Sequence, residues 1–118
     1  MQYLTVLIVE DEWLLAEDLK EELESLGCKV LGPAPSCAAA LELLFRDDKP
    51  DLAYVDTQLG PETCEAVLEE CQRLGIPVVI STGHHPRELP TFATGRPLLS
   101  KPHNRAELEQ SLSAVTTG

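Results

Sequence analysis

The sequence predicts an α/β fold in which helices cover both faces of a five-stranded parallel sheet. Five short apolar runs recur along the 118 residues, and the stretches between them carry apolar residues at helical spacing. Three of the runs are apolar almost throughout, which is typical of strands buried on both sides. Strand and helix alternate along the whole chain, so an open, doubly wound sheet in a single domain is expected.

The predicted strands have similar lengths and follow one another at regular intervals. They are residues 4–9, 28–32, 51–55, 76–81 and 96–100. Four stretches between or after them have an apolar stripe of helical period. The stripes are Leu15, Leu19, Leu23 and Leu26; Ala38, Leu41, Leu44 and Phe45; Cys64, Val67, Leu68, Cys71 and Leu74; and Leu108, Leu112 and Val115.

Helix ends are marked by capping and breaking residues. Gly27 and Gly75 are expected to close the first and third helices, and Gly60 with Pro61 to open the third. Asn104 and Glu107 have the spacing of a capping box for the last helix. The stretch 82–97 contains two glycines and three prolines, which predicts a short or irregular fourth helix.

Charge and composition exclude several classes of function. The formal net charge is −11 and the pI is near 4.5, so nucleic acids and anionic membranes would be repelled. There is neither a membrane-length apolar stretch nor a secretory leader, and a cytoplasmic location is expected. The four cysteines lack metal-site spacing and are expected to be reduced. Trp13 is expected to be a packing residue.

Polar residues follow the predicted strands at the edge where ligands bind in such sheets. Glu10, Asp11 and Glu12 follow the first strand, and Asp56 follows the third. Ser81 and Thr82 end the fourth strand and Lys101 follows the fifth. The sequence therefore predicts acids, hydroxyls and a lysine at one edge.

Clustered carboxylates with oxygen-only ligands indicate a magnesium site. Such a site suits phosphoryl transfer, with Asp56 as the nucleophile, Lys101 neutralising phosphate charge and Thr82 donating a hydrogen bond. The loop EDEWLL after the first strand has no glycine to cradle a nucleotide.

Each residue of this group also has an ordinary structural interpretation. Asp11 could cap the following helix, and Asp56 and Thr82 could belong to turns. Lys101 could be a surface lysine. Only the combination at four strand ends is specific.

The combination resembles the receiver domain of two-component response regulators over essentially the whole chain. The motifs are VEDE at 9–12, PDLAYVD at 50–56, PVVISTG at 77–83 and LLSKP at 98–102. The resemblance implies a flavodoxin-like sheet of order 2-1-3-4-5 and a single receiver domain, residues 1–118, with no output domain. It makes Asp56 the phosphoacceptor.

The other roles that the resemblance implies surround this aspartate. Glu10 and Asp11 would hold Mg²⁺ with Asp56 and the backbone carbonyl of Gln58. Thr82 would be the switch hydroxyl and Lys101 the phosphate-binding lysine, with a cis bond to Pro102. Gln58 and His84 occupy positions that tune the lifetime of the phosphoryl group.

Two positions depart from the common family pattern. Leu98 stands where many members have an aromatic switch residue, and His103 follows Lys-Pro in place of phenylalanine. The ISTGHH run, with the prolines after it, is similar to the FATGUY subgroup of single-domain receivers, and Thr82 and Gly83 match its motif.

The resemblance implies a stand-alone response regulator. A sensor histidine kinase or a histidine phosphotransfer protein would supply the phosphoryl group, and a further signalling protein could read the result. A binding module that keeps the fold without control by phosphorylation is the alternative. A third hypothesis, an aspartyl phosphatase, lacks its general acid because Gln58 stands at that position.

Overall fold

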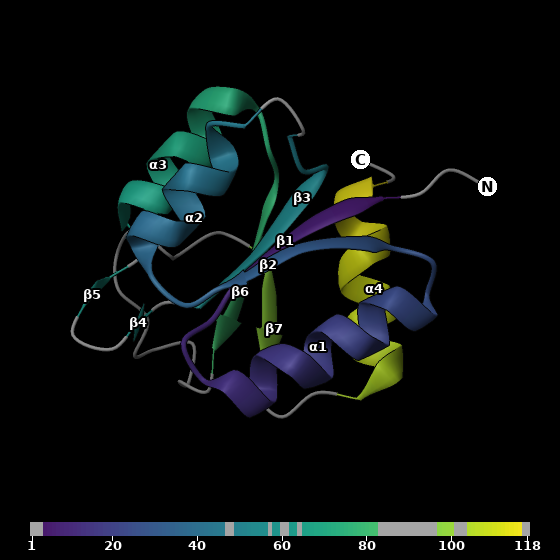
Figure 1. Cartoon of the computed structure of the whole chain (residues 1–118). Coiled ribbons are helices and arrows are strands. Elements are labelled where there is room, and N and C mark those ends of the chain that lie inside the picture. Colours follow the sequence, from purple (N-terminus) through teal and green to yellow (C-terminus); the bar gives the residue numbers. More distant parts are fainter. Residues whose placement is uncertain are drawn as a thin grey trace.

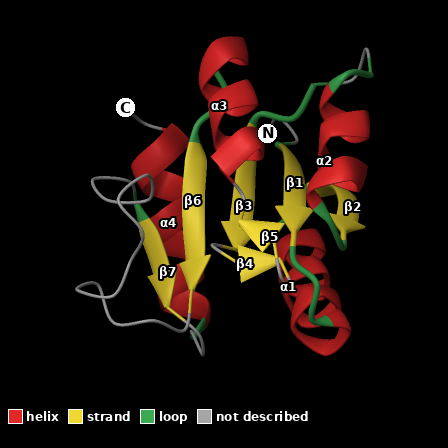
Figure 2. Ribbon diagram, turned by 90° about the vertical axis from the view of Figure 1, so that its left-hand side faces the viewer, coloured by secondary structure: helices red, strands yellow, loops and turns green. Residues whose placement is uncertain are grey.

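The main sheet of the computed structural model has five strands in the order β2-β1-β3-β6-β7, and all neighbouring pairs are parallel. The structure describes residues 4–46, 49–56, 58–59, 62–63, 65–82, 97–100 and 104–116. The five strands are β1 (Thr5–Val9), β2 (Lys29–Ala34), β3 (Leu52–Asp56), β6 (Val78–Thr82) and β7 (Leu98–Ser100). Numbered consecutively, they confirm the expected order 2-1-3-4-5. The arrows of the main sheet all point to the same edge in Figure 2.

Helices cover both faces of this sheet, as expected. α2 (Cys37–Leu44) and α3 (Glu65–Leu74) pack on one face, and α1 (Trp13–Ser25) and α4 (Arg105–Thr116) on the other (Figure 1). Among the described residues, no helix combines the length and the apolar character that a membrane crossing requires.

The strand β3 shows how one short run supplies both hydrophobic cores. Ala53 and Val55 are buried in the cluster under α2 and α3, whereas Leu52 and Tyr54 are buried in the cluster under α1 and α4. Successive side chains of a strand point to opposite faces, so both faces must be apolar. Burying each large apolar side chain contributes about 1.5–3 kcal/mol, which explains the nearly continuous apolar pattern.

The helix ends follow the predicted signals in most cases. Gly27 and Gly75 have φ angles of +90° and +75° and follow the ends of α1 and α3. The Ser36 hydroxyl accepts a hydrogen bond from the Ala39 N–H at the start of α2. Asn104 Oδ1 accepts from the Glu107 N–H at 2.8 Å and Glu107 Oε1 accepts from the Asn104 N–H at 3.2 Å. The expected capping box is confirmed.

The segment after β3 differs from the prediction. A small antiparallel hairpin, β4 (Gln58–Leu59) and β5 (Glu62–Thr63), occupies the stretch where Gly60 and Pro61 were expected to open the third helix. That helix begins at Glu65. In this hairpin Gln58 pairs with Thr63 and Leu59 pairs with Glu62. The expected irregular fourth helix falls in the stretch 83–96, outside the described residues.

Two of the predicted stripes each include a residue that is exposed. Leu15 is exposed and Ala16 is buried with Leu19 and Leu23 in α1, while Phe45 is exposed at the end of α2. Helical spacing permits either choice, and the packing of the helix against the sheet decides between them. Cys37 and Cys71 are buried and Cys28 is half-buried, and Cys64 lies outside the described residues. The reduced state of the thiols stays a prediction.

Candidate functional site

The carboxyl ends of the parallel strands are aligned by their backbone pairing. Val9 at the end of β1 pairs with Val55, and Asp56 at the end of β3 pairs with Ser81. Thr82 ends β6 and pairs with Ser100, the last residue of β7. The residues that end or follow these strands are therefore brought to one edge, as the sequence predicted.

Three acidic side chains meet at this edge. Glu10, Asp11 and Asp56 each offer a carboxylate oxygen, and these oxygens all lie within 4.8 Å of one another. Glu10 is only 6% exposed, Asp56 is partly buried and Asp11 is exposed. Two like charges 4.8 Å apart repel by about 3.5 kcal/mol at an effective dielectric constant of about 20, and by more when they are closer. A cation between them would turn this repulsion into attraction.

The buried Glu10 is fixed by the local backbone. Its N–H donates to the Ala34 carbonyl at 3.0 Å, which ties the end of β1 to the end of β2. Its Oε2 accepts a hydrogen bond from the Glu12 N–H at 3.1 Å, just before α1 begins. These hydrogen bonds hold the backbone on both sides of Asp11, at Glu10 and at Glu12.

The other predicted site residues are described only in part. For Thr82 and Gln58 the structure describes only the backbone, which lies at the end of β6 for Thr82 and in β4 for Gln58. Leu98 is the first residue of β7, pairs with Ile80 and is 38% exposed. Lys101, with its predicted cis bond to Pro102, and His84 lie outside the described residues, so the predictions made for them stay predictions.

A pocket of about 210 Å³ opens beside the acidic cluster. Glu10, Asp11 and Glu17 contribute carboxylates to its lining, and Trp13, Ala16, Pro33 and Pro35 contribute apolar surface. Trp13 is 70% exposed, so its assignment as a packing residue was wrong. It begins α1 directly after the acidic loop, at the edge of the sheet.

The two prolines of this pocket follow a backbone position that requires glycine. Gly32 has a φ angle of +91°, and an added Cβ would lie 2.6 Å from the Ala34 nitrogen and 3.0 Å from the Ile8 carbonyl oxygen. Both contacts are with backbone atoms and cannot be relieved by a rotamer change. Sequence reasoning did not identify this wall, although the run GPAP at 32–35 was a visible signal.

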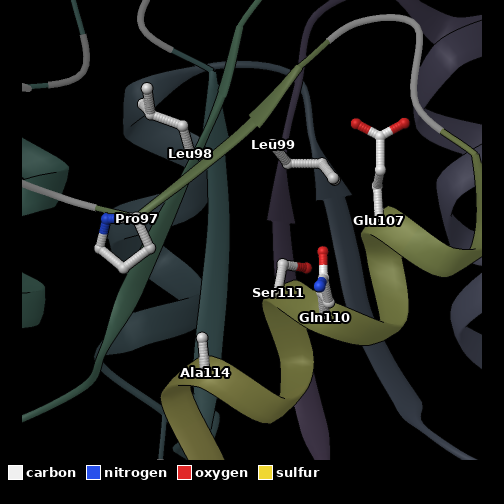
Figure 3. Close-up of a pocket in the computed structure, with 7 residues that line it drawn as sticks. All are labelled: Pro97, Leu98, Leu99, Glu107, Gln110, Ser111 and Ala114. Carbon is white, nitrogen blue, oxygen red and sulfur yellow. The ribbon is translucent and has the colours of Figure 1, made fainter.

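A second hollow, of about 380 Å³, lies between β7 and α4. Figure 3 shows Leu99 pointing from the strand toward α4, where Glu107, Gln110, Ser111 and Ala114 line the groove, whereas Leu98 points away.

Ser111 connects this groove to the strand that carries Asp56. Its hydroxyl lies 2.6 Å from the hydroxyl of Tyr54, and it donates to the Leu108 carbonyl at 2.7 Å. Burial raises the pKa of Tyr54 to about 12, because the phenolate would lose its hydration.

A sequence profile of the response regulator receiver domain matches residues 6–113. The chain belongs to the response regulator receiver family. The phyllosphere-induced regulator PhyR of Methylorubrum extorquens is 33% identical in an alignment 115 residues long that covers 92% of this chain and 42% of PhyR. The chain thus spans less than half the length of this relative.

Solved structures of receivers have the same fold. The solution structure of SdrG from Sphingomonas melonis has a TM-score of 0.85 and 32% identity, and the match covers 98% of both chains. The crystal structure of the response regulator PhyR from Brucella abortus also has a TM-score of 0.85 and 32% identity, over 98% of this chain and 49% of that one. The FATGUY subgroup assignment stays a prediction.

Proposed function

We propose that this receiver accepts a phosphoryl group on Asp56 from a phosphohistidine, in a reaction that requires Mg²⁺. The observation that carries the proposal is that carboxylate oxygens of Glu10, Asp11 and Asp56 lie within 4.8 Å of one another. They lie at the carboxyl edge of the sheet in a chain that belongs to the receiver family. A sensor histidine kinase or a histidine phosphotransfer protein would be the donor.

The donor set suits magnesium. Mg²⁺ prefers carboxylate and carbonyl oxygens as ligands, and the three carboxylate oxygens lie within 4.8 Å of one another. Glu10, Asp11 and Asp56 would supply carboxylate oxygens and Gln58 its backbone carbonyl. When bound, the ion would neutralise negative charge on the phosphoryl oxygens.

The transfer would exchange one bond to phosphorus for another. A carboxylate oxygen of Asp56 attacks the phosphorus, a P–O bond forms and the P–N bond of the phosphohistidine breaks. The bond pair remains on the imidazole nitrogen, and the product is an acyl phosphate. Lys101 directly follows Ser100, which pairs with Thr82, so this pairing supports their proposed roles as phosphate-binding lysine and switch hydroxyl.

The phosphorylation state would then change which proteins the receiver contacts. The receiver would act through these contacts as a relay, a phosphate sink or a competitor. We place this exchange in the cytoplasm, where kinases present their phosphohistidines, with no role for nucleic acid or a membrane. Leu98, at the place of the common aromatic switch residue, indicates a switch of a different kind.

Incubation with Mg²⁺ and acetyl phosphate tests the phosphoacceptor. The wild-type chain is expected to gain the mass of one phosphoryl group by intact-protein mass spectrometry, and Asp56→Asn to gain none. Asp51→Asn is a matched control, because Asp51 precedes the same strand and accepts a hydrogen bond from the Thr5 N–H. It should be phosphorylated like the wild type.

Two results would contradict the proposal. One is an equal gain in mass by Asp56→Asn, and the other is a wild-type chain that gains no mass. The second result would favour a receiver that acts through its surface without phosphorylation. Chelation of Mg²⁺ should stop the reaction. Phosphorylation that continues in a chelator would show that the reaction does not require the metal.

A further inference from the structure

A buried hydrogen bond joins the strand that carries Asp56 to α4. The hydroxyls of Tyr54 and Ser111 lie 2.6 Å apart, and both residues are buried. Ser111 donates to the Leu108 carbonyl, so the proton between the two hydroxyls comes from Tyr54. Side chains two residues apart leave a strand on the same face. Tyr54 therefore reaches α4 on the face of β3 from which Asp56 also projects.

This hydrogen bond restricts the position of α4 more narrowly than apolar packing does. Leu108 is buried and Leu112 is partly buried in the core between α4 and the sheet. Apolar contacts are not directional and permit small sliding movements, whereas a hydrogen bond weakens steeply when its geometry changes. A buried hydroxyl that loses its partner is also costly. The contact of Tyr54 with Ser111 therefore holds α4 at one place on the sheet.

The connection that leads into α4 carries the lysine proposed to bind phosphate. Lys101 lies outside the described residues, but both ends of its connection, Ser100 and Asn104, are described. Ser100 ends β7 and is held by the pairing of β7 with β6. Asn104 is held at the start of α4 by its capping box with Glu107. A shift of α4 would move one end of this short connection while the other end stays with the sheet.

We propose that Tyr54 and Ser111 are positioning residues for phosphoryl transfer to Asp56. Their hydrogen bond holds α4, and with it one end of the connection that carries Lys101, at a fixed place relative to β3. A lysine stabilises the charge of a phosphoryl group only at short range, so a small displacement is costly. The strand β3 thus supplies the phosphoacceptor and, two residues earlier, the side chain that holds the helix after the lysine.

This inference rests on the proposed function, and it concerns only the roles of Tyr54 and Ser111. Acetyl phosphate is the phosphodonor, because it needs no protein contact and its transfer rate reports on the site itself. The rate of phosphorylation with Mg²⁺ is measured by intact-protein mass spectrometry at short times. Urea unfolding followed by circular dichroism gives the stability of each variant.

The variants Tyr54→Phe and Ser111→Ala each remove one partner of the hydrogen bond. Each is expected to slow phosphorylation about fivefold, because the lysine is then held less well relative to Asp56. Ser111→Thr keeps a hydroxyl that can bond to a carbonyl of the preceding helical turn. The added methyl group has room in the groove beside α4, so this variant should react within about twofold of the wild-type rate.

A second pair of chains separates positioning of the lysine from a general structural role. Lys101→Ala alone is expected to slow phosphorylation about tenfold, through the loss of its positive charge. Adding Tyr54→Phe to Lys101→Ala should slow the reaction by less than about twofold further, because no lysine remains to be displaced. A tyrosine that supports only the fold would slow both backgrounds by the same factor.

A matched control lies on the opposite face of the sheet. The Ser36 hydroxyl caps α2 by accepting a hydrogen bond from the Ala39 N–H. Ser36→Ala removes a serine hydroxyl and one hydrogen bond, as Ser111→Ala does, and both should lower the stability by similar amounts. Because α2 does not follow the lysine, Ser36→Ala should be phosphorylated at the wild-type rate.

Each other outcome is decisive. The inference is overturned if Tyr54→Phe and Ser111→Ala react at the wild-type rate, or if Tyr54→Phe slows both lysine backgrounds equally. It also fails if Ser36→Ala slows the reaction as much as Ser111→Ala, because the rate then follows stability. Lys101→Ala with the wild-type rate would leave nothing to position. In all these cases a phosphorylated wild type keeps the proposed function, whereas a wild type that gains no mass ends it.

Discussion

The two hollows of the molecule use apolar side chains in opposite ways. In the pocket beside the acidic cluster, Trp13 stands out from the first turn of α1 with 70% of its surface exposed. In the groove between β7 and α4, Leu99 is 2% exposed and belongs to the core. One hollow is bordered by surface that the fold does not need, and the other by surface on which the fold depends.

The polar groups of the two hollows also differ in whether they hold the fold together. The first contains carboxylates that the fold leaves near a water-accessible edge, whereas the second contains the hydroxyl of Ser111, which bonds to Tyr54 and to the Leu108 carbonyl. Buried hydroxyls with partners hold elements together, and clustered carboxylates store repulsion that a ligand can relieve. Substitutions at the groove should therefore lower the free energy of unfolding. Substitutions of Trp13, at the pocket beside the acidic cluster, should change it little.

The largest effect on stability is expected from Leu99→Ala. Removing a fully buried leucine side chain should lower the free energy of unfolding by about 3 kcal/mol, through lost burial and the cavity that remains. Its neighbour Leu98 is 38% exposed, and Leu98→Ala should cost less than about 1 kcal/mol. Urea unfolding followed by circular dichroism measures both. Equal losses at the two positions would show that the groove is not built as the structure describes.

A smaller effect is expected at high pH from Tyr54. An unfolded tyrosine loses its proton near pH 10, and the folded Tyr54 keeps its proton until about pH 12. The unfolded state therefore binds fewer protons between these values, and stability should fall as pH rises from about 10 to about 12, by about 2–3 kcal/mol. Below about pH 10 this contribution is fully present.

The comparison with Tyr54→Phe isolates this contribution. The phenylalanine has no proton to lose, so the difference in unfolding free energy between wild type and variant should shrink or reverse over the same pH interval. Urea titrations at several pH values measure that difference. A constant difference would show that Tyr54 ionises as easily in the folded protein as in the unfolded one.

The smallest effect on stability is expected from Trp13→Ala. Because most of the indole is already in water in the folded state, the free energy of unfolding should change by no more than about 0.5 kcal/mol. Thermal or urea unfolding by circular dichroism measures it. A loss comparable to that of Leu99→Ala would end the distinction between the two hollows.

The sequence predicted the sheet and its order well because the signals were local and redundant. Continuously apolar runs identified the buried strands, and glycines at 27 and 75 closed two helices where a positive φ was needed. The buried face of α1 could not be chosen between Leu15 and Ala16, since both fit a helical period and only contact with the sheet separates them. The β4–β5 hairpin was missed because two-residue strands carry almost no periodicity.

The acidic cluster was predicted for a different reason. Parallel strands place their carboxyl ends together, so Glu10, Asp11 and Asp56 could be grouped from the pattern alone, and their oxygens do meet. Trp13 was misassigned because a large aromatic residue at the start of an amphipathic helix is usually covered. Its exposure depends on where α1 starts relative to the edge of the sheet.

Gly32 limits how the backbone of the pocket beside the acidic cluster can change. A Cβ there would collide with the Ala34 nitrogen and press on the Ile8 carbonyl oxygen, so any other residue would disturb the pairing of β2 with β1 just before Glu10. The shape of this pocket can therefore be altered through side chains such as Trp13 and Glu17 more readily than through its backbone.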